Sequence, residues 1–288
     1  MGVVNVTPDS FSDGGDFLDA HAAVAHALEL VEQGADILDV GGESTRPGAE
    51  PVALAEELRR VVPVLEGIAA AAGPGGRTAR VSIDTVKAPV AAAAIEAGAS
   101  IVNDVSALRA DPAMAGLVAE RGVECCLMHM LGEPRTMQRE GAGGPRYGDV
   151  VDDVKAFLEE RLAFAVDAGV AEEKVMLDPG IGFGKTVAHN LALLDRLDEL
   201  VALGRPVAIG TSRKSFIGRL LADAAGRPQP APVGERLAGT IATNVLALER
   251  GASVFRVHDV APVRDALEIA AATLSARWTA SPPRSPRS

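Results

Sequence analysis

One pattern recurs along the chain and limits its possible folds more than any other feature. An alanine- and leucine-rich stretch with helical spacing leads to a glycine, and a short β-branched run that ends in a polar residue follows. Glycine suits the left-handed residue that ends a helix before a strand begins. Alternation of helices with short apolar strands is typical of a parallel sheet covered by helices. The clear copies begin at Glu32, Glu96, Glu120, Asp167 and Glu249.

Counting these helix-to-strand joints gives eight strands. An apolar run at residues 2–6 opens the chain, and looser copies of the pattern at residues 73–84 and 204–210 fill the long gaps. Eight such units in 288 residues predict an α/β fold, a single-domain (β/α)8 TIM barrel over residues 1–276. An open, doubly wound sheet is the alternative. After Trp278 the chain is rich in Pro, Ser and Arg, so we expect residues 277–288 to be a disordered tail.

Charge and cysteine content exclude several classes of partner. The formal net charge is -11, and no basic stripe is present that could neutralise nucleic-acid phosphates. No apolar run approaches the length of a membrane span. Cys125 and Cys126 are adjacent within an apolar run, where strand geometry points them to opposite faces. We therefore expect a cytoplasmic protein in a reducing compartment, with no nucleic-acid or membrane partner.

Polar residues stand at nearly every predicted strand end. In a (β/α)8 barrel the carboxyl ends of the strands converge on one face, and chemistry is built there. A single Asp or Asn at such a position is typical of a helix cap, but cations such as Lys214 and Arg256 are poorly suited to the start of a helix. The strand-end residues are Asn5, Asp39, Asp84, Asn103, Asp104, His129, Asp178, Ser212, Lys214, Arg256 and His258.

These side chains divide into two chemical groups. Asp84, Asn103 and Asp178 suit a planar heterocycle with an edge of N–H donors, because a carboxylate can accept two of them at once. Asn5, Arg256 and His258 suit an anion, with the Asn5 amide available to a hard metal ion. The motif DPGIGFGK at 178–185 lacks the spacing of a nucleotide-binding P-loop. The sequence thus predicts a heterocycle and a phosphate as ligands.

An ordered set of motifs resembles the dihydropteroate synthase family from residue 1 to about residue 274. This resemblance implies a (β/α)8 homodimer of folate biosynthesis that depends on Mg²⁺ and is blocked by sulfonamides. The implied reaction joins 6-hydroxymethyl-7,8-dihydropterin diphosphate to 4-aminobenzoate and releases diphosphate. The motifs are NVTPDSFSDGG (5–15), GGESTRPG (41–48), SIDT (82–85), NDV (103–105), DPGIGFGK (178–185), SRKSFIG (212–218) and RVHDV (256–260).

The resemblance also implies roles for individual residues. It assigns Asp84, Asn103, Asp178 and Lys214 to the pterin, with Asp84, Asp178 and Lys214 as the catalytic group. Arg256 and His258 are implied as diphosphate anchors, Asn5 as the Mg²⁺ ligand, and Met128 as an apolar wall. Phe183 by itself is as typical of a core aromatic as of a ligand contact, and His129 is interpreted as structural. The implied aminobenzoate pocket contains Phe11, Thr45, Arg46, Pro47, Phe183, Ser212 and Lys214.

Two other functions stay open at this stage. A pterin-binding methyltransferase that acts on a methyl-folate and a corrinoid protein would share Asp84, Asn103 and Asp178 but would not need Arg256 or His258. A catalytically silent paralogue would bind pterin through the same barrel, and altered loops would mark it. The intact STRP sequence at 44–47 favours the synthase.

Overall fold

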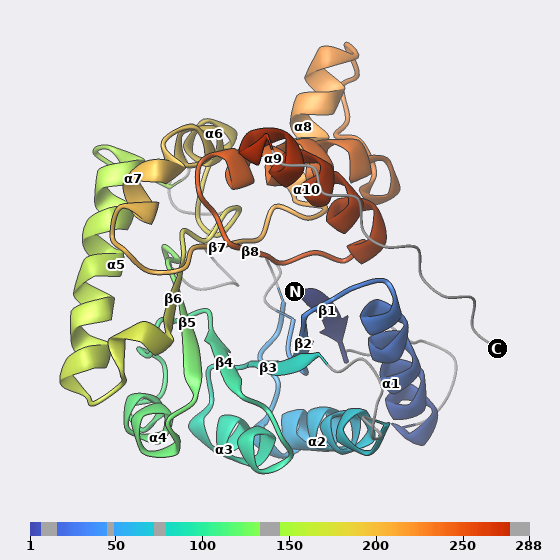
Figure 1. The fold of residues 1–288 in the computed structure, drawn as a ribbon, viewed down its shortest axis with the longest axis vertical. Coiled ribbons are helices and arrows are strands. Elements are labelled where there is room, and N and C mark those ends of the chain that lie inside the picture. Colours follow the sequence, from blue (N-terminus) through green and yellow to red (C-terminus); the bar gives the residue numbers. More distant parts are fainter. Residues whose placement is uncertain (7–15, 45–48, 72–78, 133–144, 277–288) are drawn as a thin grey trace.

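The computed structural model describes residues 1–6, 16–44, 49–71, 79–132 and 145–276. Within these ranges, parallel strands alternate with helices that surround them (Figure 1). The strands are β1 (Gly2–Asn5), β2 (Ile37–Gly41), β3 (Arg80–Asp84), β4 (Ile101–Asp104), β5 (Glu124–Met128), β6 (Val175–Asp178), β7 (Ala208–Ile209) and β8 (Val254–Phe255). The helices are α1 (Asp16–Glu32), α2 (Leu54–Ala71), α3 (Ala88–Glu96), α4 (Met114–Arg121), α5 (Val150–Asp167), α6 (Val187–Asp195), α7 (Leu197–Val201), α8 (Ser215–Ala224), α9 (Leu237–Glu249) and α10 (Val260–Ser275), with short 3-10 turns at Glu172–Lys174 and Val233–Glu235.

The strands form a closed ring. Strands β1 to β6 pair in sequential order, and β7 pairs with β8. Isolated parallel bridges between Leu177 and Val207 and between Gly2 and Val257 join the two sheets at both ends. At the second junction, the Val3 amide donates to the Val257 carbonyl at 3.0 Å. This order confirms the (β/α)8 barrel, because a doubly wound sheet reverses its strand order at a switch point.

Two apolar clusters reflect the alternation of side chains along each strand. The larger cluster includes Leu38, Ile83, Val102, Leu127 and Leu177, which pack beneath the surrounding helices. The smaller cluster contains residues of the opposite strand parity, which fill the barrel interior. Since the site residues Asp84, Asn103 and Asp178 share this inward parity, they lie above the interior cluster. The interior cluster is Ile37, Ile101, Cys126, Met176 and Ala208.

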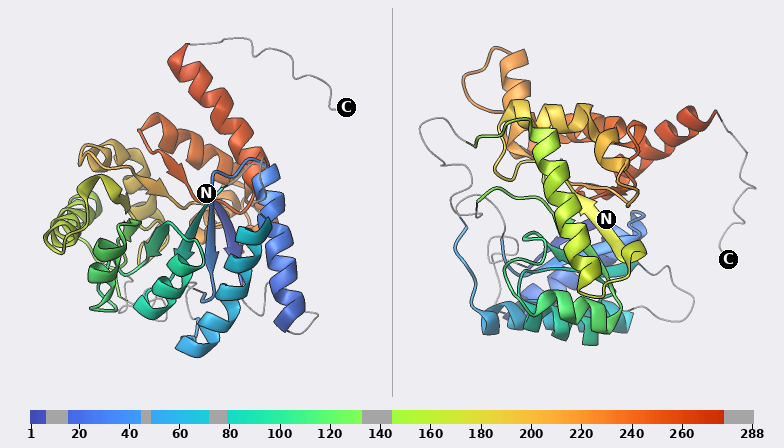
Figure 2. Two further views of the ribbon diagram at one scale, coloured as in Figure 1. Left: turned by 60° about the horizontal axis from the view of Figure 1, so that its bottom comes forward. Right: turned by 90° about the vertical axis from the view of Figure 1, so that its left-hand side faces the viewer.

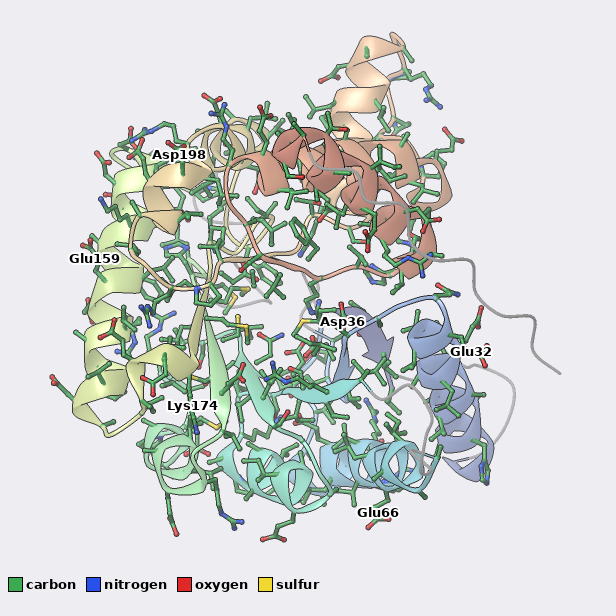
Figure 3. All side chains as sticks on the ribbon, viewed as in Figure 1. Glu32, Asp36, Glu66, Glu159, Lys174 and Asp198 are labelled. Carbon is green, nitrogen blue, oxygen red and sulfur yellow. The ribbon has the colours of Figure 1, made fainter. Side chains whose placement is uncertain are left out.

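Acidic side chains lie on the outer faces of several helices. Glu66 on α2, Glu159 on α5 and Asp198 on α7 lie at the periphery, away from the barrel (Figure 3). Helix α10 runs outward beyond its neighbours at its carboxyl end (Figure 2), where Ile269 is 70% exposed and Leu274 is 55% exposed. Among the described residues, no helix combines the length and the apolar character needed to cross a bilayer. The predicted tail at 277–288 lies outside the described residues.

Candidate active site

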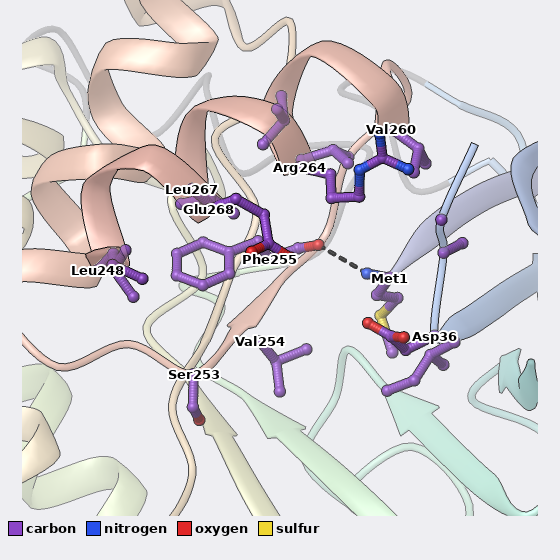
Figure 4. A pocket seen from close by; sticks show the side chains of 16 residues that line it. Met1, Asp36, Leu248, Ser253, Val254, Phe255, Val260, Arg264, Leu267 and Glu268 are labelled. Carbon is purple, nitrogen blue, oxygen red and sulfur yellow. Dashed lines mark hydrogen bonds between the residues drawn. The ribbon is translucent and has the colours of Figure 1, made fainter. Parts of the chain in front are cut away.

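Two cavities lie at opposite ends of the barrel. One, of about 400 Å³, lies at the amino ends of the strands, where the Met1 amino group donates to the Phe255 carbonyl at 2.9 Å (Figure 4). The other, of about 510 Å³, lies at the carboxyl ends. Only this second cavity is lined by the predicted chemical groups. It contains Asn5, Asp84, Asn103, Met128, Asp178, Phe183, Ser212, Lys214, Arg256 and His258.

Every predicted site residue within the described ranges therefore lines one cavity. Thr45, Arg46 and Pro47, together with Phe11, lie outside those ranges. Two residues of the motif at 41–48 that the structure describes, Glu43 and Ser44, border the same cavity. Further lining residues that received no role from the sequence are Val105, Ile181, Gly182, Gly210, Arg213, Ser215, Val233 and Arg236.

Arg256 links two buried carboxylates at the base of the cavity. Its Nε donates to Asp39 Oδ2 at 2.6 Å, and its Nη2 donates to Asp84 Oδ2 at 2.8 Å. Asn103 Nδ2 donates to the same Asp39 oxygen at 3.1 Å. One edge of the guanidinium thus faces the two carboxylates, and within the described residues Nη1 makes no hydrogen bond. The residue can therefore hold the carboxylates and still present a donor to an anion.

Burial and neighbouring charges shift the pKa values of Asp84 and Arg256. Burial raises the pKa of the Asp84 carboxyl to about 7, the Arg256 guanidinium opposes that shift, and Asp39 adds to it. Burial alone would lower the pKa of Arg256, but Asp39 and Asp84 raise it above its ordinary value. Asp39 is fully buried, and its Oδ1 accepts no hydrogen bond from the described residues. The base of the cavity therefore holds two carboxyl groups around one guanidinium, and an ionised carboxylate there is suited to stabilise a developing cation.

Asp178 ends β6 and points into the same cavity. Its Oδ1 accepts a hydrogen bond of 2.7 Å from the Gly180 amide. Burial raises the pKa of Asp178, while the Gly180 hydrogen bond and the charges of Lys214 and Arg256 oppose that rise. The carboxylate is thereby fixed in orientation and remains able to accept from a ligand.

Phe183 lies between an apolar wall and a cation. It packs with Val105, Met128 and Met130 on one side. The Lys214 Nζ lies 3.9 Å from the centroid of the ring, a cation–π contact. Phe183 is only 8% exposed and yet borders the cavity, so it combines the two alternatives that the sequence left open. Met128 packs with Phe183 and lines the cavity, and its role as a wall against a heterocycle stays a prediction.

Hydrogen bonds join the loops that follow β7 and β8 at two points. Ser212 Oγ lies 3.0 Å from His258 Nδ1 and also accepts from the His258 amide at 3.2 Å. Arg213 donates from Nε and Nη2 to both oxygens of Asp259, at 2.9 and 2.6 Å. Arg213 has a φ of 59°, which is strained for a residue other than glycine. Arg213 lines the cavity together with its neighbours Ser212 and Lys214.

The glycines of the motif at 178–185 allow close contact between loops. Gly180 has a φ of 67°, and a Cβ at this position would lie 1.8 Å from the His129 carbonyl oxygen. Gly184 has a φ of 61°, and its Cβ would lie 2.6 Å from the Leu131 carbonyl oxygen. The glycine spacing is therefore explained by packing against the loop after β5. No phosphate-binding role is needed to account for these glycines.

Asn5 is suited to hold a metal ion that binds together with a phosphate-bearing substrate. Within the described residues, no cluster of three His, Cys, Asp or Glu side chains could hold a metal by itself. Asn5 borders the cavity, and its side chain makes no hydrogen bond with the part of the chain that the structure describes. Mg²⁺ is commonly held by few protein oxygens together with waters and substrate phosphates. The Asn5 amide oxygen suits that mode of binding.

Two features of the site were not assigned from the sequence. Asp39 was noted only as a strand-end residue, but a carboxylate within an otherwise apolar strand requires a cation, and Arg256 supplies it. Lys185 is 3% exposed and contacts His129. The sequence feature that could have identified Lys185 is its position directly after GFG, where a cation follows small and apolar residues.

Comparisons with known proteins agree with this geometry. The model of the family described as pterin binding enzyme matches residues 1–258. The dihydropteroate synthase of Mycobacterium leprae (strain TN) is 51% identical over 277 residues, which cover 96% of this chain and 93% of the relative. A solved Xanthomonas albilineans dihydropteroate synthase with 4-aminobenzoic acid has a TM-score of 0.83 and 47% identity, covering 96% of this chain and 92% of that one. The Yersinia pestis dihydropteroate synthase in a sulfonamide drug complex has a TM-score of 0.85 and 42% identity, covering 96% and 94%.

Proposed function

This chain belongs to the pterin-binding enzyme family as a dihydropteroate synthase, and we propose that the cavity at the carboxyl ends of its strands joins a pterin diphosphate to 4-aminobenzoate. The observation that carries the proposal is the convergence of Asp84, Asn103, Asp178, Lys214 and Arg256 on that one cavity. The enzyme is a transferase of folate biosynthesis, and its substrates are 6-hydroxymethyl-7,8-dihydropterin diphosphate and 4-aminobenzoate.

The pterin ring lies against the apolar wall of Met128 and Val105 in this proposal. Asp178 accepts hydrogen bonds from the donor edge of the ring, and its hydrogen bond from the Gly180 amide fixes the direction in which it accepts. Asn103 supplies both a donor and an acceptor, and its own amide is oriented by Asp39. A buried acceptor matched to the substrate discriminates strongly, because a wrong ring leaves the acceptor without a partner.

The diphosphate lies beside Arg256, His258 and Asn5. Arg256 presents its Nη1 to the anion while Asp39 and Asp84 hold its other edge. Mg²⁺, when bound at Asn5, supplies positive charge that neutralises the leaving diphosphate. Lys214 and Ser212 complete the polar lining between the anion and the second substrate.

The reaction replaces a C–O bond by a C–N bond. The bond from the exocyclic methylene carbon to the bridging oxygen breaks, and its electron pair leaves with the diphosphate. The amine of 4-aminobenzoate then donates its lone pair to the carbon and loses a proton. Positive charge develops on the pterin between these events, and the carboxylates of Asp84 and Asp39 stabilise it. Such stabilisation accelerates the step because it exists only along the reaction path.

4-Aminobenzoate lies beside Phe183 in this proposal. The Phe183 ring supplies an apolar surface, and Lys214 and Ser212 supply polar contacts. Thr45, Arg46 and Pro47 lie outside the described residues, and we propose on the family resemblance that they contact 4-aminobenzoate. A sulfonamide presents a similar flat ring and amine, so we place its binding in the same pocket.

We also propose a homodimer in the cytoplasm. Helices α9 and α10 pack against each other and expose Leu246, Ile269 and Leu274 by 53%, 70% and 55%. Exposed apolar side chains of this size on adjacent helices are typical of a subunit interface. The free thiols of Cys125 and Cys126 are both buried and are typical of a reducing compartment.

Diphosphate release tests the function directly. Purified protein receives the pterin diphosphate and Mg²⁺, with and without 4-aminobenzoate, and diphosphate and dihydropteroate are both measured. We expect diphosphate release that depends on 4-aminobenzoate, with equal amounts of the two products. Pterin binding without diphosphate release would identify a silent paralogue.

A further inference from the structure

A buried lysine connects the two loops that flank the predicted pterin site. Lys185 follows β6 and is only 3% exposed. Its Nζ lies 2.8 Å from His129 Nδ1, 3.1 Å from the Phe183 carbonyl oxygen and 3.4 Å from the His129 carbonyl oxygen. An ammonium has three protons, and these atoms offer three acceptors. The contacts join the loop after β5 to the loop after β6.

His129 is suited to accept from this lysine. Burial, and then the charge of Lys185, lowers the pKa of His129 to about 3, so the imidazole is neutral. Its ring packs edge-on against Phe157, with the centroids 4.8 Å apart. A neutral imidazole can accept at Nδ1 only if its proton is on Nε2, and the Lys185 ammonium favours that tautomer. The histidine acts here as a fixed acceptor, consistent with its structural interpretation from the sequence.

The backbones of the two loops are already in close contact at this point. The His129 amide donates to the Asp178 carbonyl at 2.9 Å. A Cβ at Gly180 would lie 1.8 Å from the His129 carbonyl oxygen, so the two loops can be this close only because residue 180 is a glycine. Lys185 adds a side-chain contact to this backbone contact, because its Nζ lies within hydrogen-bond distance of the Phe183 carbonyl in the loop after β6 and of His129 in the loop after β5.

We propose that Lys185 is a positioning residue for the synthase reaction, and that its ammonium holds Phe183 and Asp178 in the arrangement that aligns the two substrates. The proposal rests on the proposed function. Lys185 does not line the cavity itself, and it acts through the Phe183 carbonyl, His129 and the charge of Asp178.

Charge provides a second link between Lys185 and the site. Burial raises the pKa of Asp178, and the positive charges of Lys214, Arg256 and Lys185 oppose that rise. Burial lowers the pKa of Lys185 to about 7, which Asp178 opposes and Lys214 reinforces. Below pH 7 the charged lysine therefore helps to keep Asp178 ionised and able to accept from the pterin. The other titratable groups near this pair are His129, His189, Arg109 and Cys126.

Two substitutions separate the hydrogen bonds of Lys185 from its charge. Lys185→Met removes both, whereas Lys185→Gln keeps amide donors without a charge. Lys174→Met is the matched control. Lys174 stands just before the amino end of β6, far from the cavity at the carboxyl end, and its ammonium contacts only the Gly122 carbonyl among the described residues. Thermal melting of all three variants confirms that each one folds.

Steady-state kinetics and calorimetry give independent results. We expect Lys185→Met to raise KM for 4-aminobenzoate and to lower kcat/KM about tenfold or more, since a displacement of about 1 Å near reacting groups can cost about 100-fold in rate. Lys185→Gln should recover part of this loss. In calorimetry with 6-hydroxymethylpterin, the affinity of both variants should fall as the pH is lowered. This loss should begin at a higher pH than in the wild type, because Asp178 protonates more readily without the lysine charge.

Two outcomes overturn the proposal. In the first, both Lys185 variants match Lys174→Met in KM and in the pH dependence of pterin binding. In the second, Lys185→Met loses activity only in proportion to a loss of folded protein. Absence of diphosphate release by the wild type would contradict the proposed function instead, while the pterin-binding measurement would still test Lys185.

Discussion

Arg256 after β8 donates a hydrogen bond of 2.8 Å to Asp84 at the end of β3, although the two strands are not neighbours in the ring. The same guanidinium donates to Asp39 on β2 at 2.6 Å. Three strands thus share one cation, whose side chain is 23% exposed. Arg256 both organises the negative base of the cavity and presents Nη1 toward the proposed anion, so its removal should affect two substrate contacts by different amounts.

Replacement of Arg256 by lysine should strongly impair the enzyme although the charge is kept. A lysine ammonium lacks the planar fork that serves Asp39, Asp84 and a phosphate together. We expect kcat/KM for the pterin diphosphate to fall roughly 100-fold, equivalent to about 3 kcal/mol, as for the disruption of a buried ion pair. Arg227→Lys, at an exposed pair with Glu235, is the control. The affinity for 6-hydroxymethylpterin, measured by calorimetry, should fall less than kcat/KM for the pterin diphosphate. Equal losses for the two ligands would mean that Arg256 supports the barrel and not the anion.

Asp178→Asn should weaken pterin binding. An amide has one acceptor oxygen, and its NH2 group would face a donor of the ring or the Gly180 amide. A cost of about 1 to 3 kcal/mol is expected for a buried group left without a partner. Calorimetric titration with 6-hydroxymethylpterin measures it, with the exposed Asp195→Asn as control. Unchanged affinity would remove Asp178 from the pterin site.

The pair of Arg213 and Asp259 should matter for diphosphate use although neither residue ends a strand. Asp259→Asn leaves one acceptor for two guanidinium donors and loosens the contact between the loops of Ser212 and His258. We expect KM for the pterin diphosphate to rise several-fold, about 1 kcal/mol, with KM for 4-aminobenzoate less affected. A double-mutant cycle with Arg213→Ala and Asp259→Ala measures the coupling. Additive effects in the cycle would show that the contact does not position these loops.

Lys185 should make stability depend on pH. Its pKa falls to about 7 from an ordinary value of 10.5, so between these values the unfolded chain holds more protons than the folded chain. Stability therefore rises with pH across this window, by at most about 1.4 kcal/mol per pH unit. Lys185→Met removes the titrating group and should flatten the urea-unfolding curve from pH 7 to 10, whereas Lys174→Met should not. Parallel curves for wild type and Lys185→Met would show that the lysine titrates normally.

The sequence by itself determined the number of strands and the chemical types at their ends. The glycine joints and short apolar runs are local signals, and a local signal is enough to count βα units and to place Asp84, Asn103, Asp178 and Arg256 at strand ends. Since parallel strands in a barrel bring their carboxyl ends together, the cavity and its two kinds of ligand group followed from that count.

Only the tertiary structure decided which of these groups pair. Arg256 contacts Asp39, which lies 217 positions earlier, and Lys185 contacts His129, which lies 56 positions earlier. Nothing in the local pattern distinguishes the role of Asp39 from that of Asp104, because each lies within a short, largely apolar run. Strand parity separates them: Asp39 faces the interior, whereas Asp104 accepts from the amides of Ser106 and Leu108 in its own loop. Ring closure and strand register fix which side chains meet, and these depend on contacts distant in sequence.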